Sequence, residues 1–87
     1  MATYAVNRNL KGISMEDLGK AQKAAIASSE ESTKNGVAVK YIRSNFYPDD
    51  GQCTCLFEAG SADDVKAVNQ KASLPFDKIK EVLDLNP

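Results

Sequence analysis

Apolar residues along the chain follow strand spacing in some segments and helical spacing in others. In residues 3–9, Tyr4 and Val6 occupy alternate positions, which predicts a first strand. From Met15 to about residue 35 the pattern has the period of an amphipathic helix. The face that this helix would bury consists of small and apolar residues: Leu18, Ala21, Ala25 and Ser28.

Polar residues and glycine mark the helix ends. Ser14 opens a variant of the capping box, and Gly36 is placed to end the first helix. A second capping signal at Ser61 predicts a helix over residues 62–72, which Pro75 follows. We therefore predict two helices of unequal length.

Between the helices lies a predicted hairpin. Residues 37–47 and 52–59 alternate as strands, and the Pro-Asp-Asp-Gly segment at 48–51 is typical of a turn. Residues 79–85 are predicted as the last strand. Simple alternation puts Val37, Val39 and Tyr41 on one face of the first hairpin strand, Ala38, Ile42 and Phe46 on its other face, and Cys53, Cys55 and Phe57 together on the second strand.

The order β-α-β-β-α-β predicts an α+β, ferredoxin-like fold: a four-stranded antiparallel sheet with two helices on one face, in a single domain over residues 1–87. We expect the first and last strands in the sheet centre. Another α+β sandwich with the same elements is the alternative. Because apolar residues occur on both faces of the strands, we also expect a homodimer joined through the uncovered face, as in a dimeric α/β barrel.

The charge and the composition of the chain argue against two classes of partner. Eleven basic and twelve acidic residues give a net charge of −1 and a pI near 5.3, with no basic stripe, so we expect no nucleic-acid partner. There is no leader-like segment and no long apolar run, so we expect no membrane association and a cytoplasmic location.

The sequence contains no histidine, which removes the commonest general base and metal ligand. Cys53 and Cys55 are the sharpest chemical feature, because two thiolates on one strand face could hold a soft metal such as copper(I) or zinc. The more frequent role of such cysteines is as small apolar fillers of a buried strand. A disulfide between them would be strained, so we expect reduced, buried thiols. We assign no cofactor, no metal ligand and no catalytic residue.

Charged residues in the middle of the hairpin strands indicate a second candidate site. A cleft lined by Tyr41, Arg43 and Glu58, flanked by Arg8, would suit a small polar ligand. A solvated sheet margin or an ion pair between subunits is the alternative. With Cys55, the predicted ligand-binding set is Tyr41, Arg43, Cys55 and Glu58.

Four segments resemble a family of small bacterial domains of unknown function: residues 41–44, 50–51, 55–59 and 74–79. The resemblance runs over roughly residues 3–85 and implies a ferredoxin-like fold that dimerises sheet to sheet. One branch of that family is described as nickel-binding. The positions that carry over are Arg43, Cys55 and Glu58, without a stated role. Because this sequence has no imidazole, we expect no tight nickel binding.

Two functions follow as hypotheses. The first is a homodimeric binding protein for a small ligand or metal ion. The second, by fold analogy, is a small cofactor-free enzyme resembling monooxygenases or isomerases of dimeric α/β-barrel type. An enzyme should hold a titratable group with a strongly perturbed pKa in its cleft, whereas a binding protein should show an apolar pocket without one.

Overall fold

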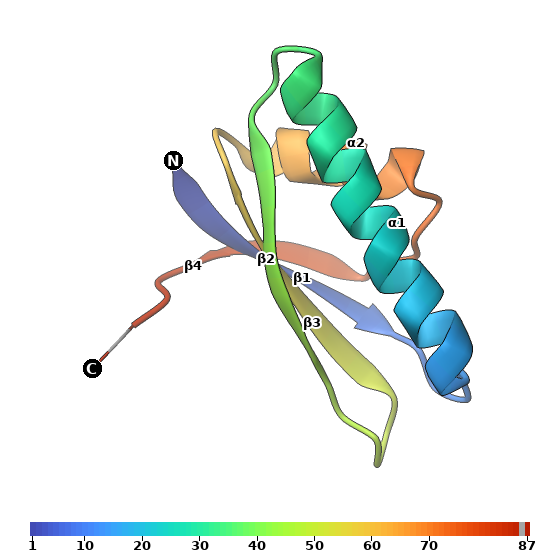
Figure 1. Ribbon diagram of the computed structural model, residues 1–87. Coiled ribbons are helices and arrows are strands. Elements are labelled where there is room, and N and C mark those ends of the chain that lie inside the picture. Colours follow the sequence, from blue (N-terminus) through green and yellow to red (C-terminus); the bar gives the residue numbers. More distant parts are fainter. Residues whose placement is uncertain (86) are drawn as a thin grey trace.

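The computed structural model describes residues 1–85 and 87. The elements follow in the order β1 (Ala2–Asn9), α1 (Met15–Lys34), β2 (Val39–Phe46), β3 (Gln52–Ala59), α2 (Ala62–Lys71) and β4 (Lys78–Val82). Both helices lie on one side of a four-stranded antiparallel sheet (Figure 1), which confirms the ferredoxin-like prediction.

The strand order β2-β3-β1-β4 places β1 and β3 in the centre, so the expectation that the first and last strands are central is wrong for the last strand. Each helix connects two parallel strands that leave room for another strand between them: β3 lies between β1 and β2, and β1 lies between β3 and β4. The edge strands carry the exposed charges Lys40, Lys78 and Lys80, which discourage pairing with further strands.

A register shift in β2 changes which of its side chains face the helices. Tyr41 pairs with Phe57 and Arg43 with Leu56, which leaves Ile42 as an extra residue between them. As a result, Phe46 pairs with Cys53 and lies on the helix-covered face together with Tyr41. The prediction of Phe46 on the opposite face is therefore wrong, because simple alternation does not anticipate a bulge.

The most completely buried side chains of the core lie beneath α2 and the C-terminal half of α1. Val6, Phe57 and Val65 have no exposed surface, and Phe57 meets Tyr41 edge to face with ring centroids 5.5 Å apart. Between the helices, the Ser28 hydroxyl donates to the carbonyl oxygen of Val68 at 2.8 Å.

Local sequence signals fix the start and end of α1. Its first turn is capped by Ser14, whose hydroxyl accepts the backbone N–H of Asp17 at 3.1 Å, as predicted. Gly36, with φ +98°, follows the C-cap residue Asn35. Gly51 (φ +75°) lets the hairpin turn approach the loop before α1, where a Cβ would stand 2.3 Å from the Cα atom of Lys11.

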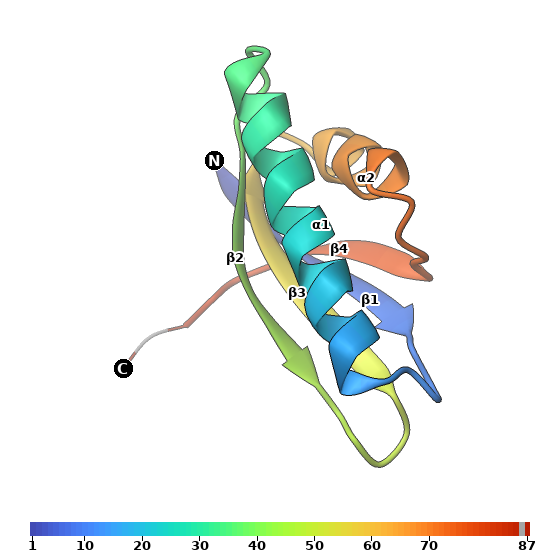
Figure 2. The same ribbon diagram turned by 45° about the vertical axis from the view of Figure 1, so that its right-hand side comes forward.

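The chain leaves the sheet after Val82, so the predicted strand over residues 79–85 ends three residues early. The last segment runs away from the helices, on the far side of the sheet (Figures 1 and 2). Asp84 pairs with Arg43 of β2, the edge strand on the opposite side of the sheet, at 2.9 Å. This contact brings the last segment across one end of the sheet face that the helices do not cover, called the open face below. Leu83 and Leu85 are 83% and 85% exposed.

The open face is less apolar than the sequence suggested. Tyr41, Phe46 and Phe57 all contact the core on the helix-covered side. Apolar residues on the open face include Ala5, Ile42, Leu56 and Val82, and of these Ala5 and Leu56 are buried by their neighbours. Within the described residues, no helix is long and apolar enough to cross a membrane.

Candidate ligand cavity beneath helix α1

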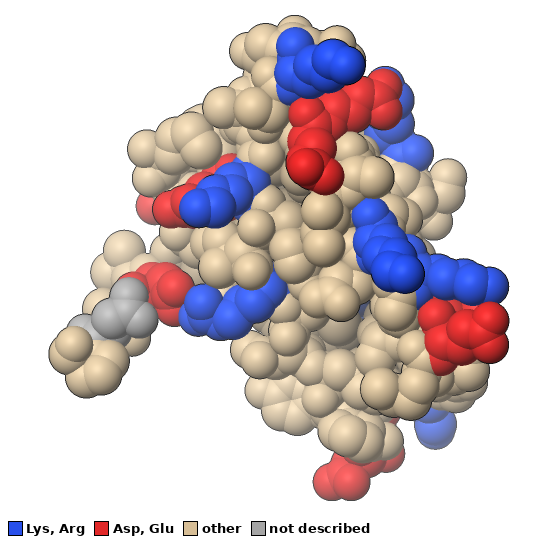
Figure 3. Space-filling view, viewed as in Figure 1, with Lys and Arg blue, Asp and Glu red and all other residues tan. Residues whose placement is uncertain are grey.

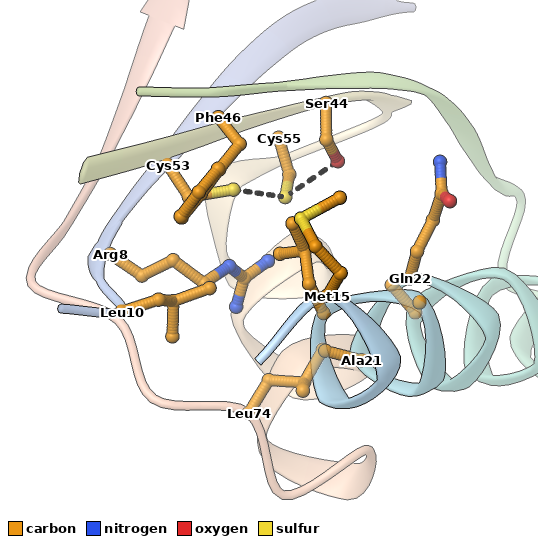
Figure 4. A pocket seen from close by; sticks show the side chains of 13 residues that line it. Arg8, Leu10, Met15, Ala21, Gln22, Ser44, Phe46, Cys53, Cys55 and Leu74 are labelled. Atoms are coloured by element: carbon orange, nitrogen blue, oxygen red, sulfur yellow. Dashed lines mark hydrogen bonds between the residues drawn. The ribbon is translucent and has the colours of Figure 1, made fainter. Parts of the chain in front are cut away.

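A cavity of about 210 Å³ lies between the N-terminal half of α1 and the sheet (Figure 4). Its walls are mainly apolar, and Met15, which is 75% exposed, lies at its solvent side. In Figure 3 the surface where this half of α1 meets β2 is largely uncharged, and charges of both signs lie around it. The main apolar side chains of the walls are Leu10, Leu18, Phe46 and Leu74.

Small residues on α1 keep this space open. Gly19 lines the cavity, and a Cβ added to it would meet no atom within 4 Å. Glycine inside a helix costs about 1 kcal/mol relative to alanine, so propensity does not explain its presence. Ala21 and Ala25 extend the same short-side-chain lining. A helix with larger residues here would fill the gap.

The two cysteines lie on the sheet side of the cavity. Both are free and buried, as predicted, and their Sγ atoms are 3.9 Å apart. The pKa of the Cys53 thiol is raised to about 11, first by burial and then by the neighbouring Cys55. Cys53 is therefore protonated at neutral pH and is a poor nucleophile.

A line of polar side chains connects this thiol pair to the surface. Gln22 Nε2 donates to the Tyr41 hydroxyl at 2.9 Å, and the Ser44 hydroxyl donates to Cys55 Sγ at 2.9 Å. Because the Ser44 proton is used in this way, Tyr41 donates to Ser44 in the contact between them. The cavity thus has one polar side that is uncharged.

Arg8 supplies the charge in this cavity. Its side chain extends from β1 into the space beside Cys53, its register partner on β3 (Figure 4). Its guanidinium donates to Asn69 Oδ1 at 2.9 Å and to the carbonyl oxygen of Pro75 at 3.1 Å. Asn69 is itself held by its Nδ2, which donates to the carbonyl oxygen of Val65 at 2.8 Å. The arginine is thereby fixed in orientation by uncharged groups.

The structure divides the predicted ligand-binding set between the two faces of the sheet. Tyr41 and Cys55 lie on the helix-covered face and are joined through Ser44. Arg43 and Glu58 lie on the open face, where Arg43 is paired with Asp84. The four residues do not line one cleft, because the bulge after Tyr41 sends the Arg43 side chain to the opposite side.

The sequence analysis placed Arg8 only beside the predicted cleft of Tyr41, Arg43 and Glu58. It did not identify Gly19 as a residue of the site. A signal for Arg8 was present, because it continues the alternation of Tyr4 and Val6 and so belongs to their buried face. For Gly19 the signal was a glycine in the interior of the long predicted helix, next to Leu18 of its predicted buried face.

The metal donors available are few. Two sulfur atoms bound to one zinc at about 2.3 Å lie roughly 3.8 Å apart, so the thiol pair could supply two ligands of a soft metal. In the described part of the chain, no three Cys, Asp or Glu residues cluster as a metal site, and histidine is missing from the sequence. Among the described residues, the side chains therefore offer a metal two neighbouring thiols and no third clustered donor.

The fold and cavity define a small ferredoxin-like domain with a partly polar space between its helices and sheet. The chain belongs to the family described as nickel responsive protein SCO4226-like, which it matches over residues 4–82. It is similar to the crystal structure of SCO4226 from Streptomyces coelicolor A3(2), with 27% identity and a TM-score of 0.82. That similarity covers 97% of this chain and 100% of the other. No curated protein sequence matches the chain significantly.

Proposed function

We propose that this protein is a non-catalytic binding protein that holds a small organic ligand in the cavity beneath α1. The observation that carries the proposal is the cavity itself, which combines apolar walls with a few fixed polar groups, as ligand sites do. Gly19 adds support, because it leaves space at a position where alanine would give a more stable helix.

The chemistry of the cavity favours binding over the alternative of a cofactor-free enzyme. Cys53 has the perturbed pKa that an enzyme site was expected to show, but the shift is upward. An activated thiol needs a lowered pKa, which favours the thiolate. Cys53 therefore acts here as part of the wall.

Filling the cavity tests the proposal. Gly19→Leu places a side chain in the open space, whereas Ala27→Leu adds the same side chain at an exposed position of α1. Small aromatic compounds, screened by thermal shift, should stabilise the parent and the Ala27→Leu variant but not the Gly19→Leu variant. Equal stabilisation of all three proteins would place binding elsewhere and contradict the proposal.

We also propose that the protein works as a homodimer in a reducing compartment such as the cytoplasm. Support for the dimer comes from the half-buried Ile42 and Val82 of the open face and from the exposed Leu83 and Leu85 beside it. The two free cysteines support a reducing compartment. Light scattering at micromolar concentration should give twice the chain mass, and a species of 9.4 kDa would contradict the dimer.

The family description refers to nickel, but the residues that the structure describes contain no cluster of three metal donors. Calorimetric titration of tag-free protein with nickel should therefore give no stoichiometric isotherm of micromolar or tighter affinity. Such an isotherm, if Cys53→Ser combined with Cys55→Ser abolished it, would contradict this expectation and identify the two thiols as ligands.

A further inference from the structure

We propose that the ligand of this cavity is a small monocarboxylate with a compact apolar body, anchored by Arg8. The inference rests on the proposed function and deepens it by naming the chemical class of the ligand.

Arg8 is a buried cation without a counter-charge. It is 2% exposed, and its two hydrogen bonds go to an amide oxygen and a backbone carbonyl. None of the ion pairs in residues 1–85 involves Arg8, and no acidic side chain lines the cavity. Holding such a charge away from water carries a free-energy cost when no anion compensates it. An anion in the adjacent cavity would remove most of this cost.

Cys53 does not provide that anion. The Arg8 charge lowers the pKa of the Cys53 thiol, but burial and Cys55 outweigh it and leave the pKa near 11. At neutral pH the thiol is uncharged, so none of the described side chains that line the cavity supplies a negative charge to Arg8.

The shape of the cavity selects among anions. A carboxylate suits Arg8, because the planar guanidinium has five N–H donors and can bind both carboxylate oxygens. The apolar walls then require an apolar body, which inorganic anions lack. A cavity of about 150 Å³ is known to hold benzene, so the 210 Å³ here has room for one ring and a carboxylate.

Other ligand classes fit less well. A nucleotide or other polyphosphate would bring several negative charges to a cavity with one cation, and it exceeds the available volume. A cationic ligand would be repelled by Arg8. A neutral ligand would fill the space but would leave the buried charge uncompensated.

Matched ligands test the charge requirement on the unaltered protein. Calorimetric titration at neutral pH and constant ionic strength would compare benzoate with benzamide, and cyclohexanecarboxylate with its amide. At least one carboxylate should bind at least tenfold more tightly than its neutral amide, and benzylamine should bind most weakly.

A variant assigns the preference to Arg8. Arg8→Met keeps much of the side-chain length without the charge, whereas Arg43→Met removes an arginine from the open face as a control. The carboxylate preference should disappear in the first variant and persist in the second. If Arg8→Met does not fold, the comparison of ligands on the parent protein still tests whether the cavity prefers a carboxylate.

The outcomes separate this inference from the proposed function. Equal or tighter binding of the amides would overturn the carboxylate anchor while leaving a small-ligand site in place. Binding that keeps its carboxylate preference in Arg8→Met would overturn the role of Arg8. No binding of any probe to the parent protein would contradict both proposals.

Discussion

The two ends of the layer between helices and sheet differ in how completely side chains fill them. Beneath α2, Phe57, Val65 and Ala59 have no exposed surface, and Asn69 uses both ends of its amide in hydrogen bonds. Beneath the N-terminal half of α1, glycine and alanine leave a cavity of about 210 Å³. The region beneath α2 is thus a packed end, which stabilises the fold. The region beneath the N-terminal half of α1 is a hollow end, and its cavity does not contribute to the stability of the fold.

The largest effect should come from truncating the packed end. Phe57→Ala should lower the free energy of unfolding by about 3–5 kcal/mol, because it removes a fully buried ring and leaves a void. Phe46→Ala, at the half-buried wall of the hollow end, should cost less than half as much. Urea denaturation measures both values, and equal losses would show that the two ends are equally packed.

A pH titration should sharpen the role of Cys53. Its pKa is about 11 in the folded protein against 9.0 for the ordinary thiol, so the folded state keeps a proton that the unfolded chain loses. The resulting stability is fully present below pH 9 and is lost as the pH rises to 11. The loss should approach about 1.4 kcal/mol per pH unit in that window.

Other groups titrate in the same range, so the comparison needs a matched variant. Subtracting the stability curve of Cys53→Ser from that of the parent isolates the thiol. A difference that stays flat between pH 9 and 11 would mean that Cys53 is not desolvated in the wall of the cavity.

The smallest effect should be a gain at the hollow end. Gly19→Ala should raise the free energy of unfolding by up to about 1 kcal/mol, since its Cβ enters open space and alanine favours helix. Thermal unfolding would measure the gain. Loss of stability instead would show that Gly19 serves packing, and the contrast between the two ends would lose support.

Short-range signals in the sequence were enough for the elements and their order. Ser14 and Ser61 cap their helices as predicted, and β3 has the expected bounds of residues 52–59. These features depend on a few neighbouring residues, which is why they can be predicted. The order of strands in the sheet depends on how the helical connections pack, and that step of the prediction was wrong for β4.

The candidate site was harder to predict because it depends on long-range geometry. One extra residue in β2 moved Phe46 to the cavity and separated Arg43 from Tyr41. Cys55 was correctly placed on the face of Cys53 and Phe57, but its link to Tyr41 passes through Ser44, which alternation alone did not single out. The guanidinium of Arg8 is held by Asn69 of α2 and by Pro75 before β4, both more than sixty residues away in the sequence. Local sequence patterns therefore do not show that Arg8 has these partners.

The most direct test of the central claim is to locate a bound ligand. Nuclear Overhauser effects between the ring protons of benzoate and the protein should reach Met15, Leu18 and Phe46, which surround the cavity. Contacts with Leu56 and Val82 of the open face, and none with the cavity residues, would contradict the account.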